Sequence, residues 1–78
     1  MRVRVVPYAE LRRLVPNRAE SLWLDLPEGA TVNDVLRELN VTIVERLIVG
    51  VDGAYATLDT PLRENAEVTL VTPMEGGT

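Results

Sequence analysis

The sequence predicts an α+β fold in which one amphipathic helix packs on one face of a mixed sheet of four to five strands. Three observations support this prediction: several short segments alternate apolar and polar residues, one segment has apolar residues at helical spacing, and turn residues separate the segments. The 78 residues suffice for a single domain. A composition of 46% hydrophobic and 26% charged residues is typical of a globular protein rather than a disordered one.

The first predicted elements are a strand and a short helical segment. Valines alternate with arginines over residues 2–6, which predicts a strand that ends at Pro7. Residues 8–15 then carry apolar side chains at helical spacing, which predicts one or two helical turns that end before Pro16.

A second strand is predicted over residues 21–26, where leucines point to one face of the sheet and Trp23 points to the other. A tryptophan on that face either anchors a partner or packs over an arginine stem of the neighbouring strand, Arg2 or Arg4. The sequence leaves both interpretations of Trp23 open.

The main helix is predicted over residues 32–39. Thr31 at its start and Asp34 three residues later have the spacing of a capping box, and the acid suits the positive end of the helix dipole. Apolar residues lie at i, i+3, i+4 and i+7 from Val32, so they form one stripe that faces the core. Asn40 is expected to end the helix because asparagine readily adopts the left-handed conformation.

Three more strands are predicted in the second half of the chain. Residues 47–51 and a short strand over residues 54–56 flank Asp52–Gly53, a strong signal for a tight turn. Leu62, in the loop that follows, is expected to fill the core. The last predicted strand covers residues 67–72.

This order of elements predicts a ubiquitin-like β-grasp fold, in which the last strand enters the sheet beside the first and seals the core. Residues 1–73 are expected to form this domain, and residues 74–78 a flexible C-terminal carrier tail. The residues expected in the core share the inward faces of the strands and the helix: Val3, Val5, Leu22, Leu24, Leu26, Val35, Leu36, Leu39, Val49, Val51, Val68 and Leu70.

The residue types present exclude most catalytic chemistry. The chain contains no cysteine and no histidine, and all eight basic residues are arginines. It therefore lacks the usual metal ligands, general bases and nucleophile activators. Ser21 is the only serine, and no neighbouring residue type would activate it. We expect no metal site, no bound cofactor and no independent catalysis.

Charge and hydropathy limit the classes of partner. Twelve acidic and eight basic residues give a net charge of −4, which argues against nucleic acid as the main partner. No apolar run approaches the roughly 20 residues that span a bilayer, and residues 1–4 begin a strand pattern rather than a signal peptide. We expect no membrane association and a cytoplasmic location.

Four segments, in this order, carry a resemblance to a known family: Tyr8–Arg12, Leu26–Val32, Val51–Gly53 and Asn65–Gly77, the last of which ends in Gly-Gly. Together they resemble the ubiquitin-like sulfur carriers, which include the small subunit of molybdopterin synthase (MoaD) and the thiamine-pathway sulfur carrier (ThiS). The helical insert at residues 8–15 is more similar to the molybdopterin branch than to the thiamine branch.

The resemblance implies a carrier rather than an enzyme. In the family, a ubiquitin-activating-type adenylyltransferase uses ATP to adenylate the C-terminal glycine, and a sulfur donor then converts it to a thiocarboxylate for molybdopterin (molybdenum or tungsten cofactor) biosynthesis. The corresponding residue here is Gly77, preceded by Gly76. Glycines suit a tail that threads a narrow channel because no Cβ atom obstructs the reacting carbon. The implied partners are this adenylyltransferase and the molybdopterin synthase large subunit or an equivalent sulfur acceptor enzyme.

Two features depart from the family pattern. The sequence continues past Gly77 to Thr78, so we expect Thr78 to be removed before Gly77 reacts. Glu75 stands where the family often has a small residue, which leaves the identity of the partner open.

A docking surface is expected on the sheet face opposite the helix. Val6, Ile48 and Val71 point to this face from adjacent strands, and grouped apolar residues on one face indicate a protein contact. The partner-binding surface is expected to continue along the chain through Pro73, Met74 and Glu75.

Three other functions remain compatible with the sequence. The chain would serve as a sulfur carrier for thiamine or another sulfur metabolite, or as a protein modifier conjugated like ubiquitin, which also uses the tail. Alternatively it would be a regulatory β-grasp (TGS-like) binding module, of the type found at the ends of nucleotide-sensing and tRNA-ligating enzymes. That last function gives no role to Gly76 and Gly77.

Overall fold

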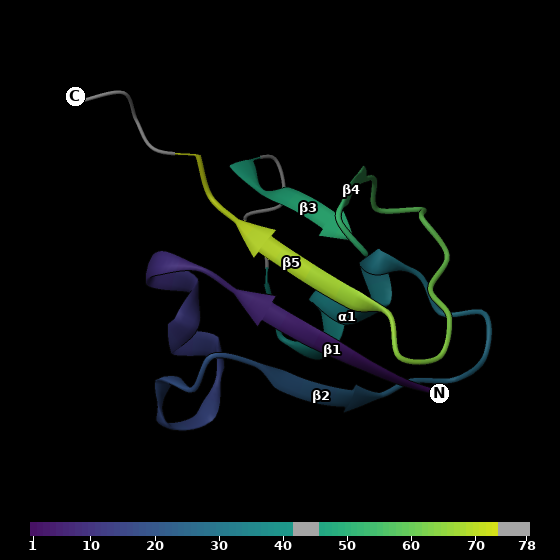
Figure 1. The fold of residues 1–78 in the computed structure, drawn as a ribbon, viewed down its shortest axis with the longest axis horizontal. Coiled ribbons are helices and arrows are strands. Elements are labelled where there is room, and N and C mark those ends of the chain that lie inside the picture. The colour runs from purple at the N-terminus through teal and green to yellow at the C-terminus, as the bar shows by residue number, and fades with distance from the viewer. Residues whose placement is uncertain (42–45, 74–78) are drawn as a thin grey trace.

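The computed structural model describes residues 1–41 and 46–73 of the chain. In this part of the chain, a five-stranded mixed sheet has α1 behind it in the view of Figure 1. The elements in chain order are β1 (Arg2–Pro7), the 3₁₀ helices η1 (Ala9–Leu14) and η2 (Pro16–Arg18), β2 (Leu22–Asp25), α1 (Val32–Glu38), β3 (Ile48–Val51), β4 (Ala54–Ala56) and β5 (Glu67–Val71).

The strand order is β2-β1-β5-β3-β4, with the first and last strands together at the centre. β1 pairs in parallel with β5, in a register that sets Val5 beside Val68. β2 pairs antiparallel with β1, while β3 pairs antiparallel with both β5 and β4. Because β1 and β5 are parallel, their carboxyl ends lie at the same end of the sheet (Figure 1). The predicted β-grasp topology is therefore confirmed.

Helix α1 begins with the predicted capping box. The backbone N–H of Thr31 donates to Oδ2 of Asp34 at 2.8 Å, so the side chain of the first turn satisfies a donor that the helix itself leaves unpaired. Asn40 adopts φ 58° after the last turn, and the N–H of Val41 donates to the Leu36 carbonyl at 2.9 Å. The helix ends at Glu38, one residue earlier than predicted.

The tight turn between β3 and β4 forms where the sequence predicts it. Asp52 and Gly53 have φ values of 51° and 88°, the left-handed conformation that closes a two-residue hairpin with the twist of its strands. Oδ1 of Asp52 also accepts a hydrogen bond from the backbone N–H of Glu67 at 2.9 Å. The turn is thereby tied to the first residue of β5.

The segment between β1 and β2 differs from the prediction of one or two helical turns. It forms two 3₁₀ helices, the second of which begins at Pro16. Tyr8 lies outside both of them and is 51% exposed, because its backbone is extended and its N–H donates to the Leu70 carbonyl at 3.0 Å. Hydrogen bonding to β5 therefore overrides the helical spacing of Tyr8.

The core lies between the sheet and α1. Its fully buried or nearly buried residues are Val3, Val5, Leu11, Leu26, Ala30, Val32, Val35, Leu36, Val49, Leu62, Ala66, Val68 and Leu70. Leu24, Leu39 and Val51 pack against this core but remain partly exposed. Leu22, predicted to be inside, is also partly exposed because β2 is an edge strand with no neighbour on its outer side.

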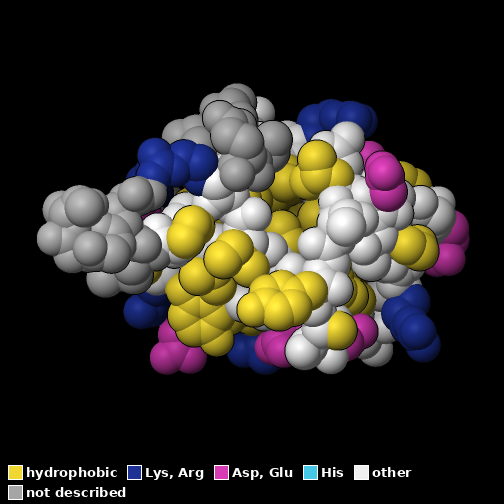
Figure 2. All heavy atoms as spheres, turned by 90° about the horizontal axis from the view of Figure 1, so that it is seen from above, with side chains coloured by type: hydrophobic (Ala, Val, Ile, Leu, Met, Phe, Trp, Pro, Cys, Tyr) yellow, Lys and Arg dark blue, Asp and Glu magenta, His cyan; other side chains and the backbone are white. Residues whose placement is uncertain are grey.

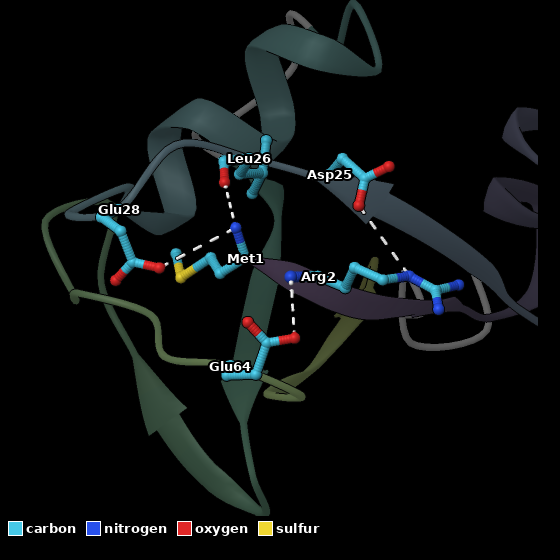
Figure 3. Close-up of polar contacts among 6 residues, drawn as sticks. All are labelled: Met1, Arg2, Asp25, Leu26, Glu28 and Glu64. Atoms are coloured by element: carbon cyan, nitrogen blue, oxygen red, sulfur yellow. Dashed lines mark hydrogen bonds and ion pairs between the residues drawn. The ribbon is translucent and has the colours of Figure 1, made fainter.

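Polar contacts hold the amino-terminal end of β1 (Figure 3). The Met1 ammonium donates to the Leu26 carbonyl at 2.7 Å and lies 3.9 Å from a carboxylate oxygen of Glu28. The backbone N–H of Arg2 donates to Oε2 of Glu64 at 3.3 Å. The loop before α1 and the loop before β5 are thus both attached to the start of the central strand.

Truncation of the core should destabilise the domain strongly. Leu36 and Leu70 are 1% and 0% exposed, so Leu36→Ala or Leu70→Ala should lower the free energy of unfolding by about 2–5 kcal/mol. The measurement is the denaturation midpoint in urea. Leu58→Ala is the matched control because Leu58 is 37% exposed, and its midpoint should change little. Equal midpoints for all three variants would contradict the assignment of faces.

Candidate protein-docking site

The sheet face opposite α1 carries an apolar group near the carboxyl end of β5. Side chains on this face alternate with the buried Val5, Val49 and Leu70, so they point away from the core. Ile48 of β3 lies directly beside Val71 of β5 in the strand register. Ile48 is 39% exposed, so the predicted apolar pair reaches solvent.

A depression of about 480 Å³ lies beside this pair. Its lining residues are uncharged: Ile48, Val49, Gly50, Gly53, Ala54, Tyr55, Thr69 and Val71. Gly50 is placed in register with Thr69 on one side and Tyr55 on the other. A Cβ atom at Gly50 would meet the Ala54 carbonyl at 3.5 Å and Thr69 Cβ at 3.7 Å, which is ordinary contact. The absence of a side chain at Gly50 therefore deepens the depression, although the backbone there would accept another residue.

Tyr55 is a residue of this face that the sequence interpretation missed. It is 90% exposed and is the most exposed of the large hydrophobic residues that the structure describes. Its position could have been inferred, because a two-residue turn at Asp52–Gly53 pairs residue 50 with residue 55. Figure 2 shows hydrophobic side chains gathered at the lower left, on the side of the molecule that faces the viewer in Figure 1.

Val6 lies on the same face but is not part of the same depression. In the sheet register it stands beside Thr69, one row away from the Ile48–Val71 pair. Val6 instead lines a second pocket, together with Tyr8 and other residues that follow β1. The three predicted docking residues therefore share one face, but only Ile48 and Val71 are directly paired.

The opposite end of the face is charged. Arg4 Nη1 lies 3.4 Å from Glu67 Oε2, and the Arg2 guanidinium lies 4.8 Å from the centre of the Trp23 ring. Trp23 is therefore stacked with Arg2, which confirms one of the two interpretations left open by the sequence. The uncharged depression extends along β3 to Gly53 and Ala54 from the Ile48–Val71 pair, which lies at the end where β5 finishes.

The chain leaves the sheet at that same end. β5 ends at Val71, and the exposed Pro73 is the last residue that the structure describes. The predicted site residues Met74, Glu75, Gly76, Gly77 and Thr78 lie outside the described residues. Figure 1 shows β1 ending beside β5, so the surface around both strand ends adjoins the end of β5 at Val71.

The geometry suits binding to a protein. Within residues 1–41 and 46–73, no group of three or more His, Cys, Asp or Glu side chains is placed to hold a metal ion. None of the helices described is long and apolar enough to cross a membrane. An uncharged depression with an exposed tyrosine at its edge is the kind of surface that receives an apolar side chain of another protein.

Solved structures of other proteins share this fold. SAMP1 (small archaeal modifier protein 1) from Haloferax volcanii superposes with a TM-score of 0.82 at 20% identity, covering 99% of this chain and 100% of that chain. A protein described as molybdopterin converting factor subunit 1 from Pyrococcus furiosus gives 0.78 at 23% identity, with 95% and 99% covered. A chain of the complex of subunits 1 and 2 of molybdopterin-converting factor from Helicobacter pylori gives 0.67 at 14% identity, with 95% and 96% covered.

Sequence comparison identifies the family. A search of curated protein sequences gives no match. The sequence model of the ThiS family matches residues 5–77 and so includes both Gly76 and Gly77. Because this match spans nearly the whole chain, the protein belongs to the ThiS family of small ubiquitin-like carriers, whose members are not enzymes.

Proposed function

We propose that this protein is a sulfur carrier whose Gly77 carboxylate is adenylated and converted to a thiocarboxylate, and that the sulfur is donated to molybdopterin biosynthesis. The observation that carries the proposal is the position of Gly76–Gly77. The pair lies inside the span matched by the ThiS family, a few residues after the central strand β5. In this proposal the domain formed by residues 1–73 binds the partner, and residues 74–78 are the tail that enters the partner's active site.

The proposed chemistry uses a main-chain carboxylate. A carboxylate oxygen of Gly77 attacks the α-phosphorus of ATP, and pyrophosphate leaves. A persulfide-type sulfur donor on the partner side then attacks the carbonyl carbon, AMP leaves, and reduction of the sulfur–sulfur bond by a thiol releases the thiocarboxylate. ATP is bound by the activating partner and the sulfur comes from a donor on the partner side, so in this proposal the chain itself binds no cofactor.

The proposed partners are a ubiquitin-activating-type adenylyltransferase and a sulfur acceptor enzyme such as the molybdopterin synthase large subunit. The apolar group around Ile48 and Val71 lies at the end of the sheet that leads to the tail. A partner that binds this group is placed to receive the tail with little extra ordering cost, because the sheet fixes the point of departure. Proteins described as subunit 1 of molybdopterin-converting factor share this fold, and the insert over residues 8–15 is similar to the molybdopterin branch. The match to the ThiS family fits a carrier for the thiamine pathway equally well.

The first prediction from this function concerns Thr78. A protein that ends at Gly77 should support ATP–pyrophosphate exchange with the adenylyltransferase encoded by the same genome. The form that retains Thr78 should be at least about 100-fold slower, because a β-branched residue displaces the reacting carbon from the channel. Exchange rates and intact mass, measured on both forms, give the test. Equal rates and sulfuration with Thr78 still attached would contradict removal of Thr78.

The second prediction concerns the docking face. Val71→Asp should raise the KM of the adenylyltransferase for the carrier about tenfold or more, because it places an unpaired charge in an apolar contact. The melting temperature should stay close to that of the parent because Val71 is only partly buried. Leu58→Asp adds the same charge at an exposed leucine away from this face and should leave KM unchanged. Unaltered affinity of Val71→Asp for both partners would count against the docking face.

A second function, protein modification, is favoured by the TM-score of 0.82 to SAMP1. It would use the same activated glycine but transfer it to an amine. This chain has no lysine to receive another copy. The Met1 ammonium is the remaining amine, and in the fold it donates to the Leu26 carbonyl at 2.7 Å.

The third prediction follows for the modifier function. Incubation of the Gly77-terminated chain with its activating enzyme and ATP should give no isopeptide-linked ladder of this protein with itself. Acetylation of the α-amino group before incubation is the control, because it removes the last amine. The products are analysed by intact mass. Ladders that persist after acetylation and resist hydroxylamine would contradict the prediction that the α-amino group is the remaining acceptor.

A further inference from the structure

A second pocket lies where β1 ends, and the docking face described above does not account for it. The pocket encloses about 280 Å³ and is lined by Val6, Pro7, Tyr8, Arg12 and Glu20. The parallel register places Pro7 beside Leu70 of β5, so the pocket adjoins the end of the sheet from which the tail departs. Val6 connects it to the sheet face that carries Ile48 and Val71.

The guanidinium of Arg12 is held in a defined position beside this pocket. Its Nη2 donates to the Arg18 carbonyl at 3.1 Å. Asn17 and Arg18 both adopt left-handed backbone angles, with φ values of 58° and 52°, within the bend that presents this carbonyl. The bend at Asn17 and Arg18, within η2, therefore fixes the direction in which Arg12 points.

The charge of Arg12 is not compensated within the described part of the chain. Its Nε atom is buried and has no hydrogen-bond partner there, which is uncommon for a buried donor. Glu20 lines the same pocket, but no ion pair joins it to Arg12. A fixed, partly desolvated guanidinium without an anion is poised to pair with a carboxylate, its best geometric match among side chains.

We propose that this pocket receives a carboxylate side chain, from Asp or Glu, of the adenylyltransferase that engages the tail. This inference rests on the proposed carrier function. A partner that covers the ends of β1 and β5 to reach Gly77 must also cover the pocket, because both strand ends lie together. The incoming carboxylate contacts the terminal guanidinium nitrogens of Arg12, Nη1 and Nη2. Arg12 thereby selects a partner with an acidic surface, while the apolar group around Ile48 and Val71 supplies the buried contact area.

The neighbouring arginine offers a matched control. Arg13 is exposed, and its Nη1 donates to the Glu10 carbonyl within the same turn at 3.3 Å. It does not line the pocket. Arg13→Gln therefore removes the same charge one residue away without touching the proposed contact.

The test is the carrier-dependent ATP–pyrophosphate exchange of the adenylyltransferase encoded by the same genome, with Gly77-terminated carriers. Arg12→Gln keeps an N–H₂ donor for the Arg18 carbonyl but removes the charge, so its melting temperature should stay near that of the parent. Its KM should rise about tenfold with kcat unchanged, because a charge-assisted contact to the partner is lost. Arg13→Gln should stay within about twofold of the parent KM, as is usual for an exposed charge. Arg12→Glu, which adds repulsion, should raise KM further than Arg12→Gln.

The outcomes separate this inference from the function on which it rests. Absence of exchange with the parent carrier overturns the proposed function and the inference together. Robust exchange with a parent-like KM for Arg12→Gln overturns the inference alone, as does an equal rise in KM for Arg12→Gln and Arg13→Gln. Glu20→Gln should lower KM by removing a negative charge that lines the pocket and would repel the incoming carboxylate. If Glu20→Gln instead raises KM as much as Arg12→Gln does, the inference is overturned, because Glu20 itself would then contact the partner.

Discussion

The parallel pairing of β1 with β5 is the constraint on which the rest of the structure depends. These strands come from opposite ends of the sequence and form the centre of the sheet. Their inward residues Val3, Val5, Val68 and Leu70 are completely buried. β2 and β3 pair with the two outer sides of this central pair, so both halves of the sheet are joined through it.

The same pairing brings the two proposed binding surfaces to one end of the sheet. Because the two central strands point the same way, the 3₁₀ segment after β1 and the chain after β5 start from one end of the sheet. The apolar depression over Gly50 and the Arg12 pocket therefore both adjoin the departure point of the tail, although their residues are distant in sequence. At the other end, charged and stacked side chains such as Arg2, Arg4 and Trp23 cover the face.

The residue inventory agrees with a binding role for the folded domain. The sequence has no cysteine, histidine or lysine, so the most common nucleophiles and the bases that activate serine or threonine are missing. In the proposed mechanism the reactive group is a main-chain carboxylate beyond the fold, so the domain has only to present surfaces. In the same proposal two surfaces bind the partner in different ways: the uncharged depression supplies buried area, and the fixed Arg12 selects the partner by charge.

Local features of the sequence predicted most elements correctly, because periodicity, capping and turn chemistry act over a few residues. The capping box at Thr31 and Asp34, the left-handed Asn40 and the turn at Asp52–Gly53 all formed as expected. The alternation of Val3 and Val5 likewise identified the buried face of β1.

The remaining features required contacts between distant segments, which no local pattern encodes. Tyr8 has the spacing of a helical residue, yet its N–H pairs with Leu70 and keeps it extended and exposed. Tyr55 became part of the docking face only through its register with Gly50. The sequence around Arg12 indicates only a solvated arginine, and its pocket exists because the 3₁₀ segment folds back on the end of β1. Side-chain periodicity therefore specified the elements and their inward faces, whereas pairing and packing across the chain determined which exposed residues meet.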